Sequence, residues 1–204
     1  MNTNIHGDNA MAGTANDGGG RRRSLWKGPA LFTALVLLIP LLGNLLVDGW
    51  HWEPRGFVLF GAIIFGLGLT YQLVTRRVDL IAYRAAVVVA LTATFILFWA
   101  NFVQSADDIN PYAMRYYLAL MVGIVGVAIA RFRAAGMARA MFATALAQAL
   151  ILAMVLTIRN SQVTSWTPAE LRGYGGNAFL GLLFVGAALL FRKAGREASA
   201  PGAV

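Results

Sequence analysis

The sequence predicts an all-α integral membrane bundle of six transmembrane helices, and three observations support this prediction. First, 58% of the 204 residues are hydrophobic and only 13% are charged, whereas a soluble domain carries about 25% charged residues. Second, the hydrophobic residues form long runs, most of them close to the ~20 residues that cross a bilayer as a helix. Third, the charged residues lie in the short segments between these runs.

The first predicted span covers residues 30–47. It follows residues 1–24, a polar and glycine-rich segment with little to bury, which we expect to be a disordered cytoplasmic tail. The three arginines at positions 21–23 resemble the paired arginines of a twin-arginine export signal. The run that follows them has no small-residue cleavage site before Asp48, and five more spans come after it. We therefore interpret it as a retained membrane anchor.

The other five spans follow from their apolar runs, at residues 57–74, 85–102, 116–130, 140–158 and 178–191. Residues 131–139, which carry three arginines, are expected to be the link between the fourth and fifth spans. Prolines favour first helical turns, and four of them precede spans: Pro29, Pro54, Pro111 and Pro168.

The segment before the sixth span contains the capping-box pattern Thr167-Pro168-Ala169-Glu170. With Gly173 as a stop signal, it predicts a short helix on the membrane surface. The sixth span itself is shorter than a bilayer crossing requires, so we expect it to extend back toward Tyr174 or the membrane to thin around it. The predicted domains are the tail at 1–24, a transmembrane domain at 25–193 and a cytoplasmic tail at 194–204.

The basic residues predict the orientation. With both termini in the cytoplasm, 13 of the 17 Lys and Arg residues lie on the cytoplasmic side, as the positive-inside rule requires. The four basic residues on the outer side are Arg55, Arg115, Arg159 and Arg172. The net charge of +8 therefore indicates a membrane protein and no nucleic-acid partner, and the cytoplasmic arginines are expected to attract anionic lipid headgroups.

The two central hairpins resemble one another at an offset of 55 residues. Gly68 matches Gly123, Arg76 matches Arg131 and Arg84 matches Arg139, among other positions. Shared alanines and leucines are expected between any two membrane helices, so the hypothesis of a duplicated hairpin depends on the glycine and the two arginines.

Two interpretations of the polar residues within the spans stay open. Gln148, Thr144, Thr92 and Thr94 would line a central cavity and contact a ligand, or they would hydrogen-bond between packed helices. We favour hydrogen bonding, because such polar contacts are common in helix bundles. None of the predicted spans has a charged residue or a histidine in its middle, which argues against proton-coupled pumps, histidine-ligated haem and intramembrane metalloproteases.

The predicted outer face carries a second group of candidates, namely His51, Glu53, Asp107 and Asp108. Carboxylates and an imidazole can hold a divalent cation, but no metal-ligand spacing is present, and we expect solvated loops with no metal. The absence of cysteine excludes disulfides, thiolate metal sites and cysteine nucleophiles. No cofactor is expected, and an enzyme is the least favoured class.

Several stretches resemble a family of small bacterial multi-pass membrane proteins to which no activity is assigned. They are Trp50-His51-Trp52-Glu53-Pro54, Asn110-Pro111, residues 130–133 and residues 136–148, within a region of roughly residues 50–150. The resemblance implies a bacterial inner membrane protein. Without a catalytic motif, the function we expect is that of a non-catalytic accessory or structural membrane component, as a homo-oligomer or with a membrane-protein partner. The alternative is a carrier for a small solute or a lipid-like molecule.

Overall fold

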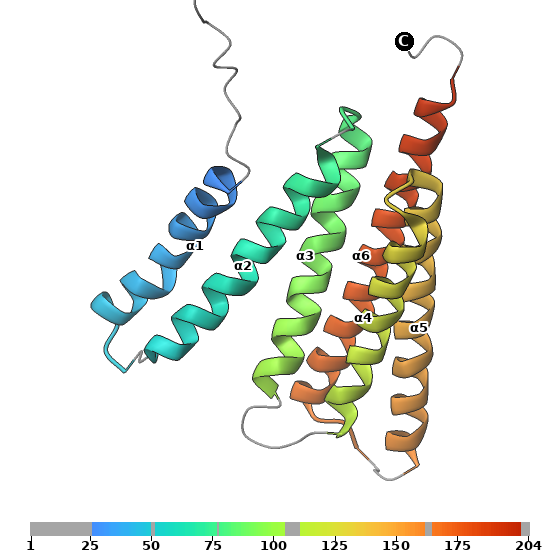
Figure 1. Cartoon of the computed structure of the whole chain (residues 1–204). Coiled ribbons are helices and arrows are strands. Elements are labelled where there is room, and N and C mark those ends of the chain that lie inside the picture. Colours follow the sequence, from blue (N-terminus) through green and yellow to red (C-terminus); the bar gives the residue numbers. More distant parts are fainter. Residues whose placement is uncertain (1–25, 50–51, 77, 105–110, 162–164, 201–204) are drawn as a thin grey trace, which may run out of the picture. The chain divides into compact units, whose positions relative to one another are not determined.

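In a computed structural model of the chain, the described residues are 26–49, 52–76, 78–104, 111–161 and 165–200, and they form six α-helices and no strand. The helices are α1 (Lys27–Leu46), α2 (Pro54–Thr75), α3 (Ile81–Gln104), α4 (Pro111–Ala130), α5 (Ala134–Asn160) and α6 (Pro168–Ala198) (Figure 1). The all-α prediction is confirmed. Within the described residues, five of the helices are long and apolar enough to cross a membrane, and the apolar part of α4, Arg115–Ala130, is shorter.

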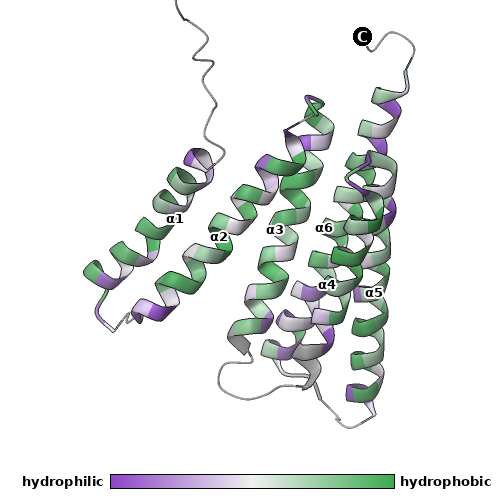
Figure 2. Cartoon of the chain, viewed as in Figure 1, coloured by the Kyte–Doolittle hydropathy of each residue, from purple (hydrophilic) through white to green (hydrophobic). Residues whose placement is uncertain are grey.

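The four helix starts that were predicted from prolines are confirmed. Pro54, Pro111 and Pro168 are the first residues of α2, α4 and α6, and Pro29 lies in the first turn of α1. Proline is suited to these positions because the first amide groups of a helix have no partner within the helix. Figure 2 shows hydrophobic residues along the middle of the helices, with hydrophilic residues gathered toward their ends.

The link between α4 and α5 is shorter than predicted, because α5 already begins at Ala134. Residues 134–139 are mostly alanine and other good helix formers, so the helix extends beyond the apolar run. The remaining turn holds Arg131 and Phe132 at positive φ angles of 47° and 60°, a backbone conformation that costs free energy for a side chain of this size. The hydroxyl of Tyr83 in α3 donates a hydrogen bond to the carbonyl of Phe132, at 2.8 Å, and stabilises this turn.

The capping box at Thr167 is present, but the prediction that Gly173 ends a separate surface helix is wrong. The helix continues through Gly173, Gly175 and Gly176 as part of α6. Each glycine weakens a helix by about 1 kcal/mol in water. In hydrocarbon, however, a break would leave backbone groups without hydrogen bonds, which costs more. The expected extension of the sixth span toward Tyr174 is therefore what the structure has.

The chain forms two compact units, residues 1–65 and residues 66–204. In the first unit, the carboxamide of Asn44 near the end of α1 makes two hydrogen bonds to the backbone of Trp52, accepting from its N–H at 2.8 Å and donating to its carbonyl at 3.1 Å. The indole of Trp52 in turn meets the rings of Phe57 and Phe60 edge to face. These contacts tie the end of α1 to the beginning of α2.

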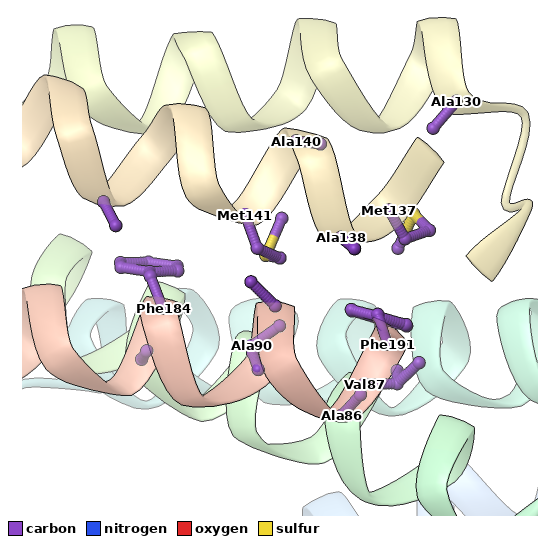
Figure 3. Close-up of a cluster of buried hydrophobic side chains, with 14 of the residues drawn as sticks. Ala86, Val87, Ala90, Ala130, Met137, Ala138, Ala140, Met141, Phe184 and Phe191 are labelled. Atoms are coloured by element: carbon purple, nitrogen blue, oxygen red, sulfur yellow. The ribbon is translucent and has the colours of Figure 1, made fainter. Parts of the chain in front are cut away.

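The second unit contains an antiparallel bundle in which α6 packs against α3 and α5, and α5 packs against α4. Its core combines alanines with a few large side chains, and Figure 3 shows Phe184 and Phe191 of α6 facing Met137 and Met141 of α5. The alanines let the helices approach closely, which is how helices in lipid gain dispersion contacts. The ring of Tyr83 meets that of Phe191 edge to face, with centroids 5.2 Å apart.

Candidate functional site

The candidate site is a group of polar side chains inside the four-helix bundle, centred on Gln148 in the middle of α5. The side chain of Gln148 is among the most completely buried in the described residues, at 1% exposure. Its Nε2 donates a hydrogen bond of 2.9 Å to the backbone carbonyl of Asn177 in α6. Because an amide group cannot be ionised, this contact fixes the register of α5 and α6 without placing a charge in the apolar interior.

Three side-chain oxygen atoms of α4, α5 and α6 are buried and have no hydrogen-bond partner within the described residues. They are Gln148 Oε1, Asn177 Oδ1 and the hydroxyl of Tyr116 in α4. The Nδ2 of Asn177 donates to the carbonyl of Gly173, one turn earlier in α6, at 3.0 Å. Each of these oxygens can therefore accept a hydrogen bond from a neutral donor, and the Tyr116 hydroxyl can also donate one.

Asn101 of α3 belongs to the same part of the bundle. Its side chain is buried and donates to the carbonyl of Leu97 at 2.6 Å. The ring contacts Phe98–Tyr117 and Tyr83–Phe191 set the antiparallel registers of α3 with α4 and with α6. By these registers, Asn101 lies opposite residue 114 of α4 and residue 173 of α6, within about one helical turn of Tyr116 and Asn177.

Thr144, one turn before Gln148, is equally buried, and its hydroxyl donates to the carbonyl of Ala140 in its own helix at 2.9 Å. Here α4 and α5 approach closely. A methyl group built on Gly123 would lie 2.9 Å from Thr144 Oγ1, and one on Gly126 would lie 2.8 Å from the Cβ of Ala140. These glycines are therefore required for helix packing at this point.

The other predicted polar residues differ in burial. Thr92 is exposed on α3 and Thr94 is partly buried. In the outer-face group, His51, Asp107 and Asp108 lie outside the described residues, and Glu53 is exposed, with a carbonyl that accepts from the amides of Gly56 and Phe57. Within the described ranges, no three His, Asp or Glu side chains form a set that could hold a metal ion.

A charged contact lies at the end of the bundle where α5 ends and α6 begins. Arg159 forms an ion pair with Glu170, and its Nε donates to Oε1 at 2.8 Å. Glu170 also accepts from the backbone amide of Thr167 and from the Thr167 hydroxyl, both at 2.9 Å. Glu170 lies in the first turn of α6, before the uncharged, apolar part of this helix, which begins after Arg172. The backbone hydrogen bond from Thr167 and the bonds from Arg159 hold the pKa of Glu170 below its ordinary value.

Asn177 and Tyr116 were not predicted as members of the site. Both residues lie near the ends of apolar runs, where polar residues are common. No feature of the neighbouring sequence distinguishes them. The only available signal was that the sixth apolar run is too short to cross a membrane unless Asn177 lies inside it.

Comparisons of the chain with models of protein families, with curated proteins and with solved structures found no match. The resemblance to bacterial multi-pass proteins and the duplication of a hairpin therefore stay predictions, and the function has to be inferred from the geometry.

Proposed function

We propose that the protein is a non-catalytic accessory or structural component of a bacterial cytoplasmic membrane, with both termini on the cytoplasmic side. On this proposal it acts by binding other membrane components. The observation that carries the proposal is that the middle of the four-helix bundle is filled by its own side chains. Met141, Phe184 and Ala187 are all 5% exposed or less, so helix packing occupies the depth at which a carrier would hold its cargo.

The location and orientation are supported by the distribution of charge. The described helices carry their charged residues toward their ends, and an uninterrupted apolar segment separates them, as in a membrane protein. The bundle end formed by the α4–α5 turn and the end of α6 carries Arg131, Arg133, Arg139, Arg192, Lys193 and Arg196. This concentration of positive charge supports a cytoplasmic position for that end.

The second candidate function is a carrier for a small solute or a lipid-like molecule. It is favoured by the buried oxygens of Gln148, Asn177 and Tyr116 that lack partners in the described part of the chain. Buried polar atoms almost always have a hydrogen-bond partner, so a ligand with hydrogen-bond donors would complete this group.

Native mass spectrometry on the protein released gently from its own membrane distinguishes the two candidates. A second protein retained in fixed ratio is the expected result and identifies the complex. A retained small molecule, lost in Gln148→Leu, would instead favour the carrier.

The matched control for that variant is Thr157→Val. Thr157 is also a polar residue of α5, but it is exposed and its hydroxyl donates to Ala153 within its own helix. A molecule lost equally from both variants would not be bound by the Gln148 group.

The proposed orientation is tested with reporter fusions. A reporter fused after Arg139 should behave as cytoplasmic, and one fused after Pro111 should behave as external. The reverse result at either position would contradict the six-span arrangement.

A further inference from the structure

A groove of about 540 Å³ lies between the first turns of α5 and the last turns of α6. Its volume is within the range of pockets that bind small molecules, roughly 300–1,000 Å³. It belongs to the second unit and is distant in both helices from the Gln148 group. Three of the residues that line it are arginines, and none is acidic.

The wall from α5 is formed by Ala135, Ala138, Arg139 and Phe142. Their spacing of three, one and three residues places them on one face of the helix. Two alanines leave room beside the helix, Phe142 adds an apolar surface, and Arg139 is exposed at the rim.

The wall from α6 repeats this spacing with Arg192, Gly195, Arg196 and Ser199. Gly195 faces the start of α5, since a methyl group on it would lie 3.7 Å from the Cβ of Ala134. The small residues of both walls therefore create the groove. Arg192 and Arg196 are one helical turn apart, and like charges at this spacing repel each other unless an anion lies near them.

The neighbouring charges do not neutralise the groove. Glu197 is the nearest acidic residue in the sequence, and its carboxylate pairs with Lys193 at 3.9 Å. Neither of these two residues lines the groove.

The groove lies at the boundary between apolar and charged sequence on both helices. In α6, Arg192 directly follows Phe191, the last residue of an apolar segment, and in α5, Arg139 directly precedes the apolar segment that begins at Ala140. In a membrane-spanning helix, such a boundary lies at the level of the lipid headgroups. Phe142 is then on the acyl-chain side of the boundary.

We propose that this groove is a binding site for one anionic glycerophospholipid. Guanidinium groups form paired hydrogen bonds with phosphate oxygens, so the phosphodiester lies among Arg139, Arg192 and Arg196. The glycerol and the first methylene groups lie against Ala138 and Phe142. This apolar part of the groove is the reason for choosing a lipid over free phosphate. The inference rests on the membrane location in the proposed function, but not on the accessory role.

The test uses the full chain in mixed micelles with equal amounts of phosphatidylcholine and phosphatidylglycerol, and counts retained lipids by native mass spectrometry. The wild type should retain one phosphatidylglycerol in preference to phosphatidylcholine. The triple variant R139Q/R192Q/R196Q should bind it about 100-fold more weakly, from roughly fivefold per arginine near a membrane surface.

Two further variants separate a defined site from general attraction by charge. The control R84Q/R131Q/R133Q removes three positive charges from the same end of the bundle but outside the groove, and it should retain the lipid. Ala135→Trp fills the groove without changing the charge, and because Ala135 is exposed, the variant should fold and lose the lipid. Equal loss in the control triple variant, or retention in Ala135→Trp, would overturn the proposal.

Inorganic phosphate distinguishes the lipid from a free anion. Added phosphate should leave the retained phosphatidylglycerol in place, whereas its displacement by phosphate at the same concentration as the lipid would overturn the choice of a lipid. Flotation of the wild type with phosphatidylcholine vesicles tests the membrane location separately. A protein that floats but retains no anionic lipid contradicts only the groove, and one that does not float contradicts the membrane location itself.

Discussion

The two halves of the four-helix bundle are held together in different ways. The half that contains the α4–α5 turn, which we call the apolar half, is packed with Phe184, Phe191 and alanines, including Ala187 and Ala194. The other half, which we call the polar half, contains Gln148 and the residues at its level. There, contacts between helices include the hydrogen bond to Asn177 and the ion pair of Arg159 with Glu170.

The difference indicates a division of roles. In lipid, apolar helices gain little from the hydrophobic effect, so close packing supplies most of the adhesion and buried hydrogen bonds add only about 0.6 kcal/mol each. A hydrogen bond is directional, however, and a shift of α6 by one residue would break the bond between Gln148 and Asn177. We infer that the apolar half supplies stability and the polar half sets the register.

The largest expected effect is that of Phe191→Ala in the apolar half. Phe191 is fully buried and in contact with Tyr83, so its truncation leaves a cavity and should lower the free energy of unfolding by about 2 to 4 kcal/mol. This loss is at the low end for a buried aromatic residue because lipid, like the core, is apolar. Reversible unfolding in mixed micelles with a denaturing detergent measures the loss. A change below about 1 kcal/mol would contradict the role given to the apolar half.

Gly126→Ala should have the next largest effect, about 1 to 3 kcal/mol, because the new methyl group would lie 2.8 Å from the Cβ and 3.2 Å from the Cα of Ala140. The helices α4 and α5 would have to separate. The matched control is Gly181→Ala in α6, where a methyl group meets nothing within 4 Å, so helix propensity should make it neutral or stabilising. The same unfolding experiment compares the two, and equal losses would argue against packing as the cause.

A smaller effect is expected for Gln148→Leu in the polar half. The variant loses one interhelical hydrogen bond, at a cost of about 0.6 kcal/mol, and also removes the buried Oε1 that has no partner in the described residues. Its thermal midpoint should therefore stay close to that of the wild type. Disulfide crosslinking between cysteines introduced at Ala147 and Ala178 reports the register, and we expect a broader pattern of crosslinks in the variant. An unchanged pattern would contradict the register role.

The smallest expected effect is the response of Glu170 to acid. The pKa of Glu170 is lowered in the folded protein, so its carboxylate stabilises the start of α6 to the full extent at any pH above the ordinary pKa of 4.5. This stabilisation is lost as the pH falls through the lowered pKa. A carboxyl carbon NMR titration in lipid nanodiscs measures this pKa. Arg159→Gln should raise it toward the ordinary value, and an unchanged titration in that variant would contradict the assigned ion pair.

Much of the fold followed from local features of the sequence. The prolines at positions 29, 54, 111 and 168 marked the starts of helices, since proline is tolerated where the amide has no partner. The capping box at Thr167 also formed as predicted. Local features misled in two places. At Gly173 the helix continues because a break in hydrocarbon would leave backbone groups without hydrogen bonds, and at residues 134–139 it begins early because most of these residues are good helix formers.

The candidate site was only half visible in the sequence. Gln148 and Thr144 stood out as polar residues in an apolar run, but the partner of Gln148 is a backbone carbonyl of α6, and a carbonyl has no signature in a sequence. The roles of Tyr116 and Asn177 could not be predicted from the sequence either, because they depend on which helix faces each residue.

By itself, the sequence determined that the chain is helical, where the helices that start at a proline begin and which segments are strongly apolar, because these properties depend on residues close together in the chain. Only the tertiary structure decided which faces meet. Lipid and protein core are equally apolar, so the faces of a membrane helix differ little in hydrophobicity. The register between helices brings Gln148 to Asn177 and forms the groove among Arg139, Arg192 and Arg196, and this register depends on residues far apart in the sequence.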